Sequence, residues 1–135
     1  MKVLLQKVRI ADPSSPLNGT IQDLLIESGT IKEIKGAIAP DSNTRVFTGK
    51  DWHVSPGWVD VFASFADPGY EQKETLETGA NAAAAGGYTD VFLVPNTKPV
   101  TDNKSQAEYI SRRSGLPVNL HPVGAVSKGA KGEES

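Results

Sequence analysis

The sequence contains no cysteine, and only two histidines and one methionine among its 135 residues. The absence of cysteine excludes disulfides, thiolate metal sites and cysteine nucleophiles. No apolar run approaches the roughly 20 residues that a membrane-spanning helix needs, and the first ten residues lack the features of a signal peptide. Clustered positive charge, which phosphate binding requires, is also scarce, since the formal net charge is −2. We therefore expect a soluble cytoplasmic protein that binds neither nucleic acid nor a membrane.

Residues 1–54 consist of short alternating segments separated by turn residues. Asn18-Gly19 and Ser28-Gly29 are typical of tight turns, because asparagine and glycine tolerate positive φ angles. The pattern predicts a hairpin over residues 23–34. Together the strand-like runs predict a small β-sandwich or sheet; they are residues 2–5, 8–10, 23–27, 30–34, 45–47 and 52–54.

From Pro56 onward the pattern changes to alternating strands and helices. An alanine-rich stretch favours a helix that can lie close to a sheet, and Gly86-Gly87 marks its end. The order β-α-β-α-β, with right-handed crossovers, predicts neighbouring parallel strands. The predicted fold class of the second segment, residues 55–135, is therefore α/β, with strands at 58–65, 88–94 and 118–126 and helices at 73–85 and 104–114.

Three strands and two helices make an incomplete sheet. The last strand is followed by a polar segment, residues 128–135, where a further helix is expected. An uncovered strand edge exposes apolar side chains and unpaired backbone groups. We therefore expect this chain to be the N-terminal part of a longer protein, or its edge to be covered by another chain.

Several motifs resemble the dihydroorotases of the cyclic amidohydrolase superfamily. The matching text is SPGWVD (55–60), DPG (67–69), ETLETGANAAAAGGYTDVFLVPNTKPVTDN (74–103) and HPVGAVSKGAKGEE (121–134). The resemblance implies the first part of a (β/α)8 TIM barrel, with residues 1–54 in the small β-sandwich beside it. It also implies the reversible cyclisation of carbamoyl aspartate to dihydroorotate in pyrimidine synthesis, carried out by a zinc-bound hydroxide.

The first barrel strand departs from the family pattern, Asp-x-His-x-His-x-Arg, in which both histidines bind metal. Here Asp60 is kept, but Phe62 and Ser64 stand at the two ligand positions. Ala66 stands where the arginine would bind the substrate carboxylate. Phenylalanine has no lone pair to donate, and a serine hydroxyl is a poor zinc ligand beside imidazole. The resemblance therefore implies a non-catalytic homologue without zinc or another cofactor in this chain, in which Asp60 is a hydrogen-bonding brace.

Asn96 is the one candidate substrate-binding residue. It follows the second barrel strand, where the family's asparagine contacts the substrate carboxylate, although without the arginine a role in making the turn is the favoured explanation. The two histidines, His53 and His121, do not form a His-x-His pair, so we expect packing or surface roles for them.

The remaining charged and nucleophilic residues have simple structural explanations. Arg112-Arg113 is expected on the solvated face of a helix, and Ser127-Lys128 is weak evidence for a nucleophile pair. Three acidic residues are expected near the first turns of the first helix, where they favour the positive end of its dipole; they are Glu71, Glu74 and Glu77.

Three functions remain open from the sequence. The first is a barrel that has lost its metal and serves as an assembly partner, in a homo-oligomer or with aspartate transcarbamoylase, as inactive dihydroorotase homologues do. The second is an active amidohydrolase with a remodelled metal site. The third is a barrel that retains Asn96 and binds a ligand without chemistry.

Overall fold

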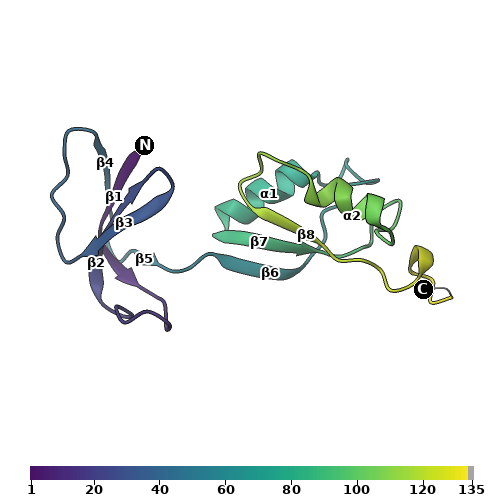
Figure 1. The fold of residues 1–135 in the computed structure, drawn as a ribbon, viewed down its shortest axis with the longest axis horizontal. Coiled ribbons are helices and arrows are strands. Elements are labelled where there is room, and N and C mark those ends of the chain that lie inside the picture. Colours follow the sequence, from purple (N-terminus) through teal and green to yellow (C-terminus); the bar gives the residue numbers. More distant parts are fainter. Residues whose placement is uncertain (134–135) are drawn as a thin grey trace. The chain divides into compact units, whose positions relative to one another are not determined.

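The computed structural model describes residues 1–133, which form two compact units, one ending at Pro56 and one beginning at Gly57 (Figure 1). Glu134 and Ser135, the last residues of the polar segment considered above, lie outside the described residues. Among the described residues, no helix combines the length and apolar character that crossing a bilayer requires.

The first unit is built on one five-stranded sheet. Its strand order is β3-β2-β1-β4, and β5 also pairs with β1. The predicted hairpin is confirmed, because β2 and β3 are antiparallel and joined at Ser28-Gly29, where both φ angles are positive. Strands β4 and β5 run parallel to β1, which the sequence pattern does not reveal. The strands are β1 (Lys2–Ile10), β2 (Ile21–Glu27), β3 (Thr30–Lys35), β4 (Thr44–Thr48) and β5 (His53–Val54).

The second unit has the predicted β-α-β-α-β order. Its three strands are parallel and lie in the order β6-β7-β8. A short 3-10 helix follows the last strand. The elements are β6 (Trp58–Ala63), α1 (Leu76–Ala85), β7 (Tyr88–Leu93), α2 (Lys104–Ser111), β8 (Asn119–Pro122) and η1 (Lys128–Ala130).

Several predicted boundaries of the second unit were wrong, and the first strand, β6, ends at Ala63 rather than at residue 65. Helix α1 begins at Leu76 rather than at residue 73, because Thr75 and Thr78 form a capping box that ends the preceding loop. Helix α2 ends at Ser111 rather than at residue 114. Strand β8 ends at Pro122 rather than at residue 126, since the backbone N–H of Ala125 donates to Thr101 in a loop.

The core of the second unit lies between the sheet and its two helices. Helix α1 packs on β7 and helix α2 on β8 (Figure 1). A Cβ added to Gly79 would lie 2.6 Å from the ring of Phe65, so glycine lets α1 approach the end of the first strand closely. The buried residues are Leu76, Ala80, Val91, Leu93, Ile110 and Val118. The opposite face of the sheet carries Phe62, Asp90, Phe92 and His121, and it contains the candidate site.

Candidate functional site

Two loops pack together at the carboxyl ends of β6 and β7. The backbone N–H of Lys98, in the second loop, donates to the carbonyl of Pro68 in the first at 2.9 Å. Gly69 has a φ of +104°, and a Cβ there would lie 2.2 Å from the carbonyl oxygen of Lys98. Only glycine fits this conformation and this approach. The two loops are therefore locked against each other.

This locked arrangement brings Ser64 and Asn96 together. The Nδ2 of Asn96 donates to the Ser64 hydroxyl at 3.1 Å, and that hydroxyl lies 3.2 Å from Asn96 Oδ1. Ser64 follows β6 and Asn96 follows β7. The two residues meet because parallel strands present their carboxyl ends at the same edge of a sheet. The candidate substrate-binding amide is thus hydrogen-bonded to the residue at the second family ligand position.

Asp60 and Phe62 lie in β6, the strand that ends directly before Ser64. The Phe62 side chain is 79% exposed on the sheet face that the helices do not cover. The Oδ1 of Asp60 accepts a hydrogen bond from the backbone N–H of Phe62 at 2.9 Å. The Asp60 carboxylate therefore braces the backbone of its own strand.

Asp67 is a site residue that sequence reasoning missed. It directly follows Ala66, it is 3% exposed, and its carboxylate accepts hydrogen bonds from Leu76 N at 3.1 Å and from the Tyr109 hydroxyl at 2.9 Å. The hydrogen bond to Asp67 raises the pKa of Tyr109 above its ordinary value. Asp67 thus ties the first loop to the start of α1 and to α2. The sequence signal that could have indicated this role is the position of Asp67, directly before Pro68-Gly69 and a few residues before a predicted helix.

A carboxylate–imidazole pair lies on the uncovered face of the sheet. His121 Nε2 lies 2.8 Å from Asp90 Oδ1, and the imidazole ring stacks on Phe92 with centroids 4.7 Å apart. The hydrogen bond from His121, followed by those from Asn119 and Thr89, holds the pKa of Asp90 below its ordinary value of 3.8. His121 lies in β8 as predicted, and this pair is the nearest approach to acid–base chemistry in the unit.

The other histidine and the serine–lysine pair do not join this group. His53 belongs to the first unit, where its Nδ1 lies 2.9 Å from the carbonyl oxygen of Asp51. The Ser127 hydroxyl accepts a hydrogen bond from Gly132 N at 2.7 Å, which is a turn contact. Across residues 1–133, no three His, Asp or Glu side chains gather as a metal would require.

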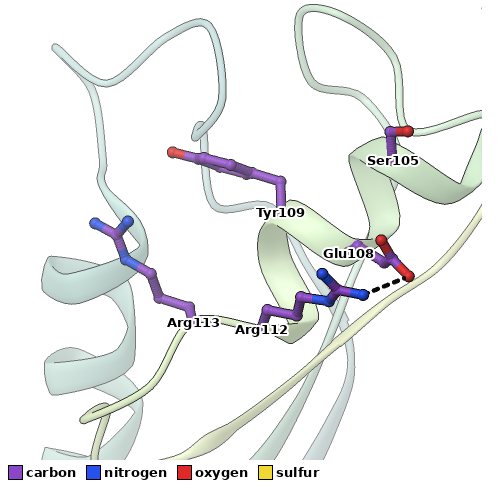
Figure 2. Close-up of a pocket in the computed structure, with 5 residues that line it drawn as sticks. All are labelled: Ser105, Glu108, Tyr109, Arg112 and Arg113. Carbon is purple, nitrogen blue, oxygen red and sulfur yellow. Dashed lines mark ion pairs between the residues drawn. The ribbon is translucent and has the colours of Figure 1, made fainter.

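Figure 2 shows a surface pocket beside α2, lined by Ser105, Glu108, Tyr109, Arg112 and Arg113. Arg112 pairs with Glu108 at 3.0 Å, one helical turn earlier. Arg113 donates from Nε to Glu77 at 2.8 Å, and this ion pair holds the pKa of Glu77 below its ordinary value. Both guanidinium groups are paired with carboxylates, but the expected helix face was wrong, because α2 ends at Ser111 and Arg112 is its C-cap.

The expectation for the three acidic residues near α1 was partly wrong. Only Glu77 lies in the first turn of the helix. Glu71 accepts a hydrogen bond from the backbone N–H of Gly69 at 2.8 Å, and Glu74 accepts one from the Thr78 hydroxyl. Both residues precede α1: Glu71 stabilises the loop at Gly69, and Glu74 bonds to Thr78 in the first turn of the helix.

Comparisons with known proteins agree with one another. The family model described as "Dihydro-orotase-like" matches residues 53–135. The dihydroorotase of Geobacter metallireducens is 40% identical over 98% of this chain, and that of Acetivibrio thermocellus is 43% identical over the same share. The chain spans 32% and 31% of the lengths of these relatives.

Two solved structures have the same fold over most of the chain. The L-hydantoinase of Arthrobacter aurescens superposes with a TM-score of 0.73 at 21% identity, over 90% of this chain and 27% of its own. A dihydroorotase crystal structure superposes with a TM-score of 0.63 at 18% identity, over 95% of this chain and 32% of its own.

Proposed function

Because this chain belongs to the dihydroorotase-like family, we propose that it forms part of a cytoplasmic dihydroorotase-like protein of pyrimidine synthesis that does not itself catalyse the reaction. One observation carries the proposal. The first strand offers an exposed phenyl ring at Phe62 and a hydroxyl already hydrogen-bonded to Asn96 at Ser64. These are the two positions at which the family pattern places imidazole ligands.

The residues at this strand do not fit a zinc ion. Phe62 supplies no donor atom, and the Ser64 hydroxyl is a weak neutral ligand. The Asp60 carboxylate accepts a hydrogen bond from the backbone N–H of Phe62. The His121 imidazole, in β8, is hydrogen-bonded to Asp90 in β7. We therefore assign no reaction step to a metal held by these residues.

The same reasoning limits substrate binding. In the family the asparagine acts together with an arginine, and here Ala66 supplies no charge. Asp90 lies on the uncovered sheet face and disfavours an anionic ligand such as carbamoyl aspartate. Asn96 retains one amide that could contact a ligand, in competition with Ser64. Binding without chemistry therefore ranks below a scaffold role.

As a scaffold, the protein would act through assembly. We propose that it associates with itself or with aspartate transcarbamoylase, the enzyme that supplies the carbamoyl aspartate used by this family. The interlocked loops at Gly69 and Lys98 and the buried carboxylate of Asp67 support this proposal, because they hold the end of the first strand in place with protein contacts alone.

One alternative has an observation in its favour. The Asp90–His121 pair is hydrogen-bonded at 2.8 Å and partly exposed, as a general base oriented by a carboxylate would be. An active amidohydrolase with a remodelled site would use it to activate water. This alternative predicts that His121→Gln abolishes hydrolysis of a cyclic amide, whereas the scaffold proposal predicts no hydrolysis to lose.

The test is a turnover assay on the natively purified polypeptide that carries this chain. Dihydroorotate hydrolysis and carbamoyl aspartate cyclisation are both followed, since the reaction is reversible. The proposal expects no turnover above buffer, together with co-purification of a second copy or of aspartate transcarbamoylase. Turnover that His121→Gln removes would replace the proposal by the remodelled-site alternative.

A further inference from the structure

The connection between β1 and β2 contains an exposed asparagine, Asn18, that is followed by glycine. Gly19 has a φ of +80°, and nothing lies within 4 Å of the position that a Cβ would take there. Every other asparagine of the chain precedes a residue with a side chain; these following residues are Thr44, Ala82, Thr97, Lys104 and Leu120. Only at Asn18 does no side chain shield the backbone nitrogen that follows the asparagine.

The side-chain amide of Asn18 is set up as an electrophile. Its Oδ1 accepts a hydrogen bond from the backbone N–H of Asp12 at 2.9 Å, which draws electron density away from the amide carbon. Among the described residues, the Nδ2 of Asn18 makes no hydrogen bond, so the nitrogen that would leave is not held. Asn103 is a useful contrast: its Oδ1 also accepts from a backbone N–H, that of Gln106 at 3.2 Å, but its Nδ2 donates to Asp102 at 3.1 Å.

One hydrogen bond restrains the neighbouring nucleophile. The backbone N–H of Gly19 donates to the carbonyl of Ile10 at 2.8 Å, and this nitrogen must lose its proton before it can attack a carbonyl carbon. The bond lies where β1 ends, two residues before β2 begins at Ile21. Hydrogen bonds at the ends of strands open locally at a lower free-energy cost than those in the middle of a sheet. Reaction at Asn18 therefore follows local opening of this turn.

We propose that Asn18 is a site of spontaneous covalent modification by deamidation. The Gly19 nitrogen bonds to the Asn18 Cγ, the Cγ–Nδ2 bond breaks, and the proton lost by the Gly19 nitrogen ends on the departing ammonia. The product is a cyclic imide, which water opens at the side-chain carbonyl to give aspartate or at the backbone carbonyl to give isoaspartate. The sequence of steps consumes water and releases ammonia, and it needs no oxidant or cofactor. It goes beyond the proposed function, because it concerns the first unit alone.

The two products have different consequences for the first unit. An aspartate at position 18 keeps an oxygen that can accept from the N–H of Asp12, now as a stronger charge-assisted bond. Arg9, which donates to the carbonyl of Gly19, supplies positive charge beside it. An isoaspartate instead adds a methylene group to the backbone and displaces the Gly19 N–H from Ile10. Isoaspartate therefore loosens the connection from β1 to β2, whereas aspartate preserves it.

The test ages the natively purified polypeptide that carries this chain at mildly alkaline pH and follows its asparagines by peptide mass spectrometry. We expect conversion of Asn18 to both aspartate and isoaspartate, and no conversion of Asn103 over the same period. In urea, which releases the Gly19 N–H from Ile10, conversion should be about tenfold faster. Gly19→Ala should slow the reaction in urea about tenfold, because a side chain then shields the attacking nitrogen. This last comparison does not depend on whether the variant folds.

The structural consequence has its own readout in the folded protein. The backbone N–H of Ile10 donates to Thr20 at 2.9 Å, so its hydrogen exchange should be faster in the isoaspartate fraction and unchanged in Asn18→Asp. Equal exchange in both would contradict the loosening. Conversion of Asn18 in urea but not in the folded polypeptide would overturn the proposal, because the turn would then protect the site completely. So would equal conversion of Asn18 and Asn103, or aspartate without isoaspartate, which would indicate direct hydrolysis by water.

Discussion

The amide of Asn96 donates to the hydroxyl of Ser64 at 3.1 Å, joining two residues that lie 32 positions apart in the sequence. The bond connects the ends of two neighbouring parallel strands at the position where the family pattern places a metal ligand. The Ser64 hydroxyl is thus engaged by a neighbouring side chain. The consequences for stability and chemistry can be tested separately.

The Ser64–Asn96 bond should appear as a coupling between two substitutions. Ser64→Ala and Asn96→Ala each remove the same contact, so the double variant should be less destabilised than the sum of the single variants. We expect a coupling of about 0.5 to 1 kcal/mol, typical of an exposed neutral hydrogen bond. Urea denaturation of all four proteins measures it. Strict additivity would mean that the bond does not hold the strand ends together.

Gly69→Ala should be strongly destabilising. The added Cβ would meet the Lys98 carbonyl at 2.2 Å, and the φ of +104° is unfavourable for alanine. We expect a loss of about 2 kcal/mol or more in the free energy of unfolding. Gly124→Ala is the matched control in the same unit, because nothing lies within 4 Å of its added Cβ. Equal effects of the two substitutions would argue against the interlocked loops.

Tyr109→Phe should destabilise the second unit through Asp67. The substitution removes one of the two donors to a carboxylate that is 3% exposed. Leaving a buried acceptor partly unsatisfied costs about 1 to 3 kcal/mol. Tyr70→Phe serves as the control, since the described residues give the Tyr70 hydroxyl no hydrogen bond. Thermal denaturation compares the pair, and a Tyr109→Phe protein as stable as the control would refute the bracing role of Asp67.

The Asp90–His121 pair predicts a pH dependence at acid pH. Because hydrogen bonds lower the folded-state pKa of Asp90, its carboxylate stabilises the fold fully above 3.8 and loses this contribution as the pH falls through the lowered value. The difference in stability between the wild type and Asp90→Asn should therefore shrink as the pH falls below about 4.

The cause of this shift can be checked directly. In His121→Ala the largest hydrogen bond to Asp90 is removed, so the pKa of Asp90 should rise toward 3.8 when its carboxyl carbon is followed by NMR. Asn119 and Thr89 would still donate, so part of the shift should remain. An unchanged pKa would show that the imidazole does not act on this carboxylate.

The sequence predicts the elements of the second unit better than their contacts. The order β-α-β-α-β follows from apolar runs and glycine stops, all of which are local signals. The start of α1 was misplaced because the capping box depends on Thr75 and Thr78 bonding to each other. The early end of β8 depends on a loop more than 20 residues away, at Thr101. Neither contact is encoded in hydropathy.

The candidate site shows the same division. The prediction that Phe62 and Ser64 stand where the family pattern has histidines rests on the sequence of this one segment. The partners of those positions could not be predicted in this way, because Ser64 and Asn96 lie in loops after two separate strands, and these loops pack together at Gly69 and Lys98. Likewise, Asp90 and His121 are brought together by the register of β7 and β8. Long-range pairing of this kind requires the fold.

The zinc content of the natively purified polypeptide that carries this chain tests the central claim most directly. Elemental analysis should find no stoichiometric zinc in the wild type. The double variant Phe62→His and Ser64→His, which restores the family ligands, should gain zinc under the same conditions and so serve as the positive control. About one zinc per chain in the wild type, lost on substitution at Ser64 or Asp60, would contradict the account and return the first strand to a metal site.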